Sequence, residues 1–266
     1  MRKTAIVFLL GLALLLSGAS QVFAGPVMDR IQEKGELVVG ITGTQPPLNM
    51  VTKSGEIIGM DADLAHLIAA NLGVKLSFKK LPFEELLPAV EKGKVDIVVS
   101  NFSMTLERNR KVAFVGPYLA SGKGILTKQK LVEQLQTKEG LNTPDMTVAV
   151  LRNSTSQEYV EKSSEKAKIV ATGTLAMAVN MLLEDKVDAV VADFPFCSFT
   201  AFRHKDQGLV AGESSLSYEP LGFAVQEDVL LINWLGNFIE TLKGTGVLNQ
   251  IHNRWFKGGD WLKELP

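Results

Sequence analysis

Two polar residues follow the same short apolar pattern at two places in this chain. The segments EKGKVDIVVSN and LEDKVDAVVAD share the core K-V-D-x-V-V and end at Asn101 and Asp193. Such apolar runs predict buried strands, and ligands of open α/β sheets bind beyond the carboxyl ends of the strands. If two lobes face each other, Asn101 and Asp193 meet across a cleft and can bind a polar ligand. A carboxylate is costly to bury unpaired, so Asp193 is expected either to bind a ligand group or to cap the turn before Pro195.

The other reactive residue types show no catalytic or metal-binding pattern in the sequence. His66, His204 and His252 are far apart and match neither a metal cluster nor a Ser-His-Asp order. Cys197 is the only cysteine, so no intrachain disulfide can form, and its apolar neighbours predict a small buried core residue. The sequence therefore predicts no metal and no other cofactor.

The elements around Asn101 are predicted to alternate between strands and helices. Apolar residues recur at helical spacing in a segment that Asp61 can cap and Gly73 ends. Pro82 opens a second helix that Gly93 closes. The apolar runs between these helices predict strands of a sheet that is covered on both faces. Strands are predicted over 36–41, 74–81 and 95–100, and helices over 60–73 and 82–93.

The same alternation restarts after Thr127 and leads to Asp193. Strands are predicted over 146–151, 167–172 and 187–193, and helices over 130–136, 156–166 and 174–185. The segment 221–256 adds one strand and two helices. These two runs of strand and helix predict an α/β protein with two doubly wound lobes. The repeated core is then one βαβ ending that is used once in each lobe.

The first residues carry the pattern of a secretory signal peptide. Arg2 and Lys3 precede an apolar run from Ala5 to Leu16, and Val22-Phe23-Ala24 fits a cleavage site. The run is shorter than the roughly 20 residues of a membrane-spanning helix. We therefore expect removal of residues 1–24 and export of a soluble protein. The remaining 242 of the 266 residues carry a net charge of −3, which predicts no nucleic-acid partner.

Several motifs stand in a fixed order along the rest of the chain. They are P-P-L after the first strand, IGMDADLA, PFEELLPAVEKGKVDIVVSNFSMTLERNRKVAF, GPYLASG, NSTSQEY, the strand-end Asp193 and GTGVLNQIHNRWF. In this order and spacing the chain resembles the polar amino-acid-binding periplasmic proteins that feed ABC importers. The resemblance implies a type II periplasmic-binding-protein fold, in which two α/β lobes joined by two crossover strands close over one small ligand. It places lobe 1 at 25–121 and 218–266, lobe 2 at 122–217, and a hinge at the crossovers.

The resemblance also implies a cage for the charged groups of an amino acid. Arg108 matches the arginine that binds the ligand α-carboxylate, which a guanidinium can hold with two hydrogen bonds. Thr155 matches a residue whose backbone N–H meets the same carboxylate. Asp193 matches the aspartate that receives the α-ammonium, and Ser100 and Ser103 match the strand-end groups that complete the cage.

The residues expected near the ligand side chain depart from the family pattern at two positions. The resemblance implies that Phe83 forms a pocket wall, that Leu151 contacts the side chain and that Asn101 belongs to the same site. Thr42 stands where many members have an aspartate, and Gln45 stands where they usually have an aromatic lid. Without that aspartate a buried cationic side chain lacks a counter-charge. We therefore expect a polar uncharged or acidic amino acid rather than lysine or arginine.

Two alternative functions remain open. One is an enzyme like the exported cyclohexadienyl dehydratase of this fold, for which Asp61, Asp193 and Glu158 are candidate general acids. Asp61 also matches a position that can help to bind a cationic side chain. The intact ammonium-binding aspartate favours binding over catalysis. The other alternative is a detached sensor module that signals the presence of ligand to a receptor. Sensor domains of this kind are usually fused to a membrane span. We therefore expect a periplasmic, monomeric binding protein that is not an enzyme and whose partner is the permease of an ABC importer.

Overall fold

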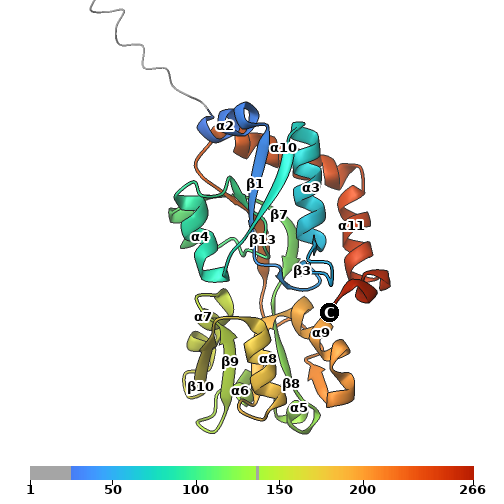
Figure 1. Cartoon of the computed structure of the whole chain (residues 1–266). Coiled ribbons are helices and arrows are strands. Elements are labelled where there is room, and N and C mark those ends of the chain that lie inside the picture. The colour runs from blue at the N-terminus through green and yellow to red at the C-terminus, as the bar shows by residue number, and fades with distance from the viewer. Residues whose placement is uncertain (1–24, 136–137) are drawn as a thin grey trace, which may run out of the picture.

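The chain folds into two lobes, each built around a five-stranded sheet that is flanked by helices (Figure 1). The computed structural model describes residues 25–135 and 138–266, and the predicted signal peptide at 1–24 lies outside them. In Figure 1 the blue and cyan elements and the red C-terminal helices share one lobe, whereas the yellow and orange elements form most of the other. The predicted fold class, two α/β lobes joined by two crossovers, is confirmed.

Both sheets have the same plan. The first runs in the order β5 (Lys75–Lys80), β1 (Glu36–Ile41), β6 (Ile97–Val98), β13 (Glu219–Val225) and β7 (Ala113–Ser121). The second runs in the order β10 (Lys168–Thr172), β9 (Thr147–Leu151), β11 (Ala189–Asp193), β8 (Lys123–Lys128) and β12 (Leu209–Ala211). In each sheet the first three strands are parallel, and each later strand is antiparallel to its neighbour. The predicted parallel pattern thus covers three strands of each sheet, and β6 is shorter than predicted.

Helices cover the sheets of both lobes. The first lobe contains α2 (Pro26–Lys34), α3 (Met60–Leu72), α4 (Phe83–Glu91), α10 (Val229–Gly244) and α11 (Val247–Phe256). The second contains α5 (Val132–Leu135), α6 (Lys138–Leu141), α7 (Thr155–Ser163), α8 (Leu175–Leu183) and α9 (Phe194–Arg203). A small sheet of β2 (Thr44–Gln45), β3 (Asn49–Val51) and β4 (Ile57–Ile58) precedes α3. In the described ranges, none of the helices combines the length and apolarity needed to cross a membrane.

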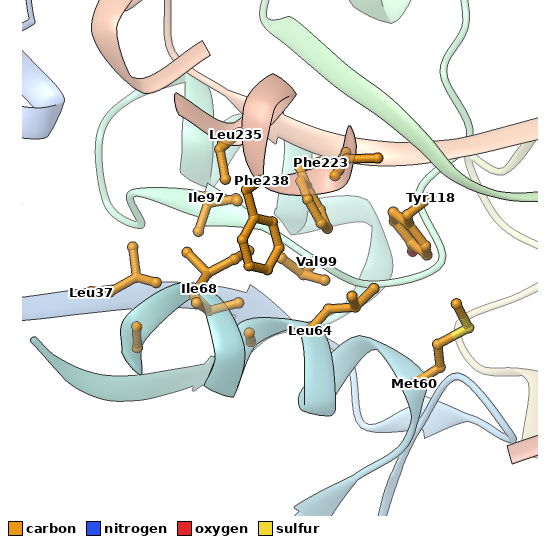
Figure 2. Close-up of a cluster of buried hydrophobic side chains, with 14 of the residues drawn as sticks. Leu37, Met60, Leu64, Ile68, Ile97, Val99, Tyr118, Phe223, Leu235 and Phe238 are labelled. Carbon is orange, nitrogen blue, oxygen red and sulfur yellow. The ribbon is translucent and has the colours of Figure 1, made fainter. Parts of the chain in front are cut away.

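Apolar side chains from helices and strands fill the core of the first lobe. Figure 2 shows Leu64 and Ile68 of α3 in one cluster with Phe238 of α10 and Ile97 of β6. Leu64 and Ile68 are four residues apart, which places both on the same face of the helix. Full burial of each such side chain stabilises the fold by roughly 1.5–3 kcal/mol. This packing fixes the position of β6 and therefore of Asn101, which follows it.

The two crossovers between the lobes lie side by side. Ser121, the last residue of β7, pairs with Glu219, the first residue of β13. Two residues further along, the Lys123 amide donates a hydrogen bond to the Ser217 hydroxyl at 3.0 Å. A Cβ atom at Gly122 would lie 1.9 Å from the Ser217 carbonyl oxygen, so only glycine fits there without displacement. The predicted lobe boundaries and the predicted hinge fall at these crossovers and stay predictions.

The repeated K-V-D core has one structural role in both lobes. Asp96 accepts a hydrogen bond from the Val38 amide at 2.8 Å, and Asp188 accepts one from the Thr147 amide at 2.8 Å. Val38 belongs to β1 and Thr147 begins β9. Each aspartate therefore ties the start of its own strand to the neighbouring parallel strand.

We expect Asp188→Ala to destabilise the second lobe. The change leaves the Thr147 amide without its side-chain acceptor, which typically costs about 1–3 kcal/mol. Urea unfolding followed by circular dichroism measures the loss. Asp206→Ala, at an exposed aspartate, is the control and should change the free energy of unfolding by less than about 0.5 kcal/mol. Equal midpoints for Asp188→Ala and the wild type would show that this aspartate does not hold the strand.

Candidate functional site

The two lobes enclose a small cavity beyond the carboxyl ends of β6 and β11. Its lining comprises Gln45, Phe83, Asn101, Ser103, Lys123, Leu151, Ser154, Thr155, Ser156, Leu175, Ala192 and Asp193. The free volume of about 10 Å³ corresponds to roughly one water molecule, so the cleft is closed. Most of the residues that the sequence assigned to the site lie in this lining. The structure describes the other three, Arg108, Ser100 and Thr42, and places them outside it.

The two strand-end residues meet across the cleft. The side-chain amide of Asn101 donates to Asp193 Oδ2 at 2.6 Å and to Gln45 Oε1 at 2.6 Å. Asn101 has a φ of 50°, in the left-handed region that asparagine adopts more readily than most residues. A second contact between the lobes joins the hydroxyls of Ser103 and Thr155 at 3.3 Å. Side chains from both lobes thus hold the cleft closed.

Asp193 ends β11 and occupies the N-cap position of α9. Within the described part of the chain its carboxylate makes no capping hydrogen bond, so the capping alternative that the sequence left open is not realised. Oδ1 accepts instead from the Lys123 ammonium at 2.7 Å, and Oδ2 accepts from Asn101. The side chain is 14% exposed, and these partners offset the cost of its burial.

Lys123 is a site residue that sequence reasoning missed. Its side chain is 1% exposed, and its ammonium contacts Thr155 Oγ1 at 2.6 Å, Asp193 Oδ1 at 2.7 Å and Glu219 Oε2 at 3.3 Å. A buried ammonium requires such partners because removing a charge from water is costly. The signal in the sequence was a lysine between two glycines at the start of an apolar strand, in G-K-G-I-L-T.

Arg108 begins a short 3-10 turn on the first-lobe side of the cavity. Its Nη1 donates to the Ser103 carbonyl at 3.1 Å, and its guanidinium lies over the rings of Phe102 and Phe83, at 4.3 Å and 5.6 Å from their centroids. Burial lowers the pKa of the guanidinium, and the carboxylate of Glu158 is the largest influence that raises it. Arginine keeps its charge in proteins. Arg108 therefore supplies a positive charge beside Ser103 and Phe83, which line the cavity.

The N-terminus of α7 provides a second feature that suits an anion. Ser154 caps this helix by accepting a hydrogen bond from the Gln157 amide at 3.3 Å. Ser154, Thr155 and Ser156 all line the cavity. The first amides of a helix and its dipole favour a negative group. This placement suits the carboxylate-binding role that the family resemblance implies for Thr155.

Ser100 and Thr42 brace the loop beside the cavity. The Ser100 hydroxyl accepts from the Thr42 amide at 2.9 Å and donates to the Thr42 hydroxyl at 3.3 Å. The Thr42 hydroxyl donates to Asn49 Oδ1 at 2.7 Å. Both hydroxyls are thus engaged within the first lobe, and their direct contact with a ligand stays a prediction.

Asp61 is fully buried behind Asn101. Its Oδ2 accepts from the Asn49 side chain at 2.7 Å and from the Asn101 amide at 2.8 Å, and its Oδ1 accepts from the Tyr118 hydroxyl at 2.7 Å. The prediction that Asp61 caps α3 is wrong, because these partners bind its carboxylate and the N-cap residue is Gly59. Burial raises the pKa of Asp61 to about 6, and the three hydrogen bonds oppose this shift.

The lone thiol has a structural role. Cys197 is buried in the core of the second lobe, as predicted. Burial raises the pKa of the thiol to about 12, so it is protonated and unreactive at neutral pH. Across the described residues, no three or more His, Cys, Asp or Glu side chains are grouped so that they could hold a metal ion.

Two α/β lobes close over a cavity that lies beside the Arg108 guanidinium, the Asp193 carboxylate and the N-terminus of α7. This combination defines a solute-binding protein. The sequence model of the bacterial extracellular solute-binding proteins, family 3, matches residues 37–258. The chain belongs to this family, and the resemblance seen in the motifs is confirmed.

Known proteins similar to this chain include binding proteins and an enzyme. The chain is 25% identical to a cyclohexadienyl dehydratase from Pseudomonas aeruginosa over 91% of each chain. Its sequence is 34% identical to that of an ancestral amino acid-binding protein, a precursor of cyclohexadienyl dehydratase, whose crystal structure is known. The match covers 86% of this chain and 99% of that one, and the TM-score is 0.79. It is 32% identical to a putative ABC transporter binding component from Wolinella succinogenes complexed with lysine, over 86% of this chain and 99% of that one, with a TM-score of 0.83.

The buried carboxylate of Asp61 predicts a pH dependence of stability. Its pKa is about 6 in the folded protein against an ordinary value of 3.8. The folded state therefore binds this proton more readily than the unfolded chain does. The resulting stabilisation is fully present below the ordinary pKa and is lost as the pH rises through the folded value. Its size is about 3 kcal/mol.

Asp61→Asn isolates this contribution. Asparagine can accept from the Asn101 amide and donate to the Tyr118 oxygen, so most of the network survives. Between about pH 4 and pH 7, the free energy of unfolding of the wild type should fall relative to that of Asp61→Asn by about 3 kcal/mol. Denaturant unfolding at several pH values measures the difference. A difference that does not change with pH would show that Asp61 titrates at its ordinary value.

Proposed function

We propose that this protein captures an amino acid in the cleft between its lobes and delivers it to the permease of an ABC importer. An α-amino acid carries a carboxylate and an ammonium on one carbon. Arg108 on the first lobe and Asp193 on the second offer the two opposite charges on either side of the cavity, and this pairing is the observation that carries the proposal. The N-terminus of α7 adds amides for the carboxylate.

The cellular setting belongs to the same proposal. The signal-peptide pattern of residues 1–24 and membership of an extracellular solute-binding family support export and function in the periplasm. We take 25–121 with 218–266 and 122–217 as the lobes that move about the crossovers. Both lobes of one chain supply the cavity lining, and we take a monomer as the binding unit.

For the ligand side chain we propose a polar uncharged or acidic group. Asp61, which could have served a cationic side chain, is fully buried and is engaged by three hydrogen-bond donors. Lys123 adds a positive charge to the cavity lining, which favours an uncharged or acidic ligand side chain over a cationic one. Gln45 also lines the cavity and carries an amide that can donate and accept. The lysine-bound relative from Wolinella succinogenes represents the opposite choice, which a titration can decide.

We propose binding rather than catalysis, although one similar protein is a dehydratase. Dehydration requires a group that donates a proton to the departing oxygen. Asp61 has the raised pKa that suits such a donor, but its oxygens accept hydrogen bonds inside the first lobe. Asp193 faces the cavity, and its oxygens accept from the Lys123 ammonium and the Asn101 amide. Both arrangements favour a site that holds a ligand.

Loss of the Arg108 guanidinium should weaken amino-acid binding without unfolding the protein. Arg108→Ala leaves the ligand carboxylate without its partner in a closed cleft, at a cost of roughly 2–5 kcal/mol, or about 30-fold to several thousand-fold in affinity. Arg110→Ala is the matched control, since Arg110 lies in the same turn and is exposed. Calorimetric titration measures both variants. Affinity like that of the wild type would remove Arg108 from the ligand site.

Competitive titration of glutamine, glutamate, arginine and lysine should identify the class of side chain. We expect glutamine or glutamate to bind at least about tenfold, or about 1.4 kcal/mol, more tightly than arginine or lysine. All four are compared on one preparation that has been unfolded, dialysed and refolded to remove carried-over ligand. Tightest binding by arginine or lysine would contradict the proposed side-chain class. Failure to bind any of the twenty amino acids would contradict the proposed function itself.

A further inference from the structure

The Lys123 ammonium occupies the acceptor that the proposed function assigns to the ligand ammonium. It contacts Asp193 Oδ1 at 2.7 Å and Thr155 Oγ1 at 2.6 Å. Asp193 is the acceptor proposed for the α-ammonium, and Thr155 begins the helix proposed for the carboxylate. The Lys123 side chain is almost fully buried and lines the cavity, so it is an internal cation of the site.

A ligand ammonium and Lys123 cannot share Asp193 in this arrangement. One carboxylate oxygen accepts from Lys123 and the other accepts from Asn101. The cavity has room for only about one water molecule, so a second ammonium would lie against the first. Two like charges at that separation repel strongly in a buried site. An amino acid can therefore bind Asp193 only if Lys123 leaves it.

Glu219 provides a place for the displaced lysine. Its Oε2 lies 3.3 Å from the Lys123 ammonium, farther than the 2.7 Å to Asp193, and its side chain is 13% exposed. Lys123 thus already stands within reach of both carboxylates and lies closer to Asp193. A small movement of the ammonium towards Glu219 would exchange one ion pair for the other.

The charges around the cavity balance when a zwitterion is bound in this way. Of the four side chains involved in the exchange, Arg108 and Lys123 are positive, and Asp193 and Glu219 are negative. The ligand carboxylate then pairs with Arg108 and the ligand ammonium with Asp193. Lys123 pairs with Glu219, so each of these four side chains has a partner of opposite charge.

We propose that Lys123 is an internal placeholder for the α-ammonium, which the ligand displaces from Asp193 onto Glu219. The proposal rests on the proposed binding of an amino acid. It makes Lys123 a competitor that weakens binding, and Glu219 the residue that makes the displacement possible. Lys123 begins β8 and Glu219 begins β13, both next to the crossovers. The ion pair of the ligand-bound state therefore forms where the two lobes are joined.

A double-mutant cycle with L-glutamine as the probe tests the displacement. Lys123→Met removes the competing cation and keeps an unbranched side chain, so glutamine should bind about tenfold more tightly. Glu219→Gln removes the charge that receives Lys123, so glutamine should bind about tenfold more weakly. In the Lys123→Met background, Glu219→Gln should change the affinity by less than about threefold, because no lysine has to be received.

Two results would overturn the displacement. Weaker glutamine binding by Lys123→Met would mean that Lys123 itself holds the ligand. Equal effects of Glu219→Gln with and without Lys123 would mean that Glu219 does not receive the lysine. Circular dichroism and thermal melting of the ligand-free variants verify folding. If Lys123→Met does not fold, Lys123→Gln, which removes the charge and keeps a hydrogen-bond donor, carries the same expectation.

Glutaric acid monoamide, which is glutamine without its α-ammonium, separates this proposal from the proposed function. The wild type should bind it more weakly than glutamine, and Lys123→Met should not tighten its binding, because it has no ammonium to replace the lysine. Tight binding of the monoamide by a wild type that binds no amino acid would contradict the proposed function. If the wild type binds glutamine and Lys123→Met binds it more weakly, the displacement is contradicted and the proposed function is not.

Discussion

The ion pair between Lys123 and Asp193 sets the conditions that the rest of the cleft must meet. A buried ammonium and a buried carboxylate are both costly to remove from water, and a pair of them is tolerated only where further hydrogen bonds satisfy each group. Thr155 and Glu219 contact the lysine, and Asn101 donates to the aspartate. These partners come from a helix N-terminus, a strand at the crossover and the facing lobe. One buried interaction thus ties three distant parts of the chain to the same point.

A continuous line of contacts connects this point to the core of the first lobe. The Tyr118 ring packs in the cluster of Figure 2 and stacks on Phe223, with ring centroids 5.1 Å apart. Its hydroxyl donates to Asp61, which accepts from the Asn101 amide. The Asn101 side chain then reaches Asp193 on the other lobe. The position of the strand end that closes the cleft therefore depends on three features together. They are the core packing of Tyr118, the buried carboxylate of Asp61 and the left-handed backbone conformation of Asn101.

Local patterns in the sequence predict the elements and the meeting of Asn101 with Asp193, because apolar periodicity and strand ends are local signals. The rest depends on partners far away in the chain. Lysine is almost never fully buried unless it is paired, and the partners of Lys123, which are Thr155, Asp193 and Glu219, lie far from it in the sequence, so its two flanking glycines alone do not predict burial. Asp61 stands in the first turn of a helix, where a cap is expected, and its actual partners come from other segments. The antiparallel strands arise where the crossovers join the sheets, as in the pairing of β7 with β13, which no short pattern encodes.

The missing side chain at Gly122 allows the two crossovers to lie in close contact. Because the Ser217 carbonyl lies where a Cβ atom would stand, the crossovers touch backbone to backbone. The two crossover segments are paired side by side. Neither can slide along the other without breaking the hydrogen bond between the Lys123 amide and the Ser217 hydroxyl. The predicted hinge would then bend or twist both crossover segments together. A methyl group at this position would push the two crossover segments apart and so would alter the predicted hinge. If ligand binding uses this hinge, its strength would depend on a position that does not line the cavity.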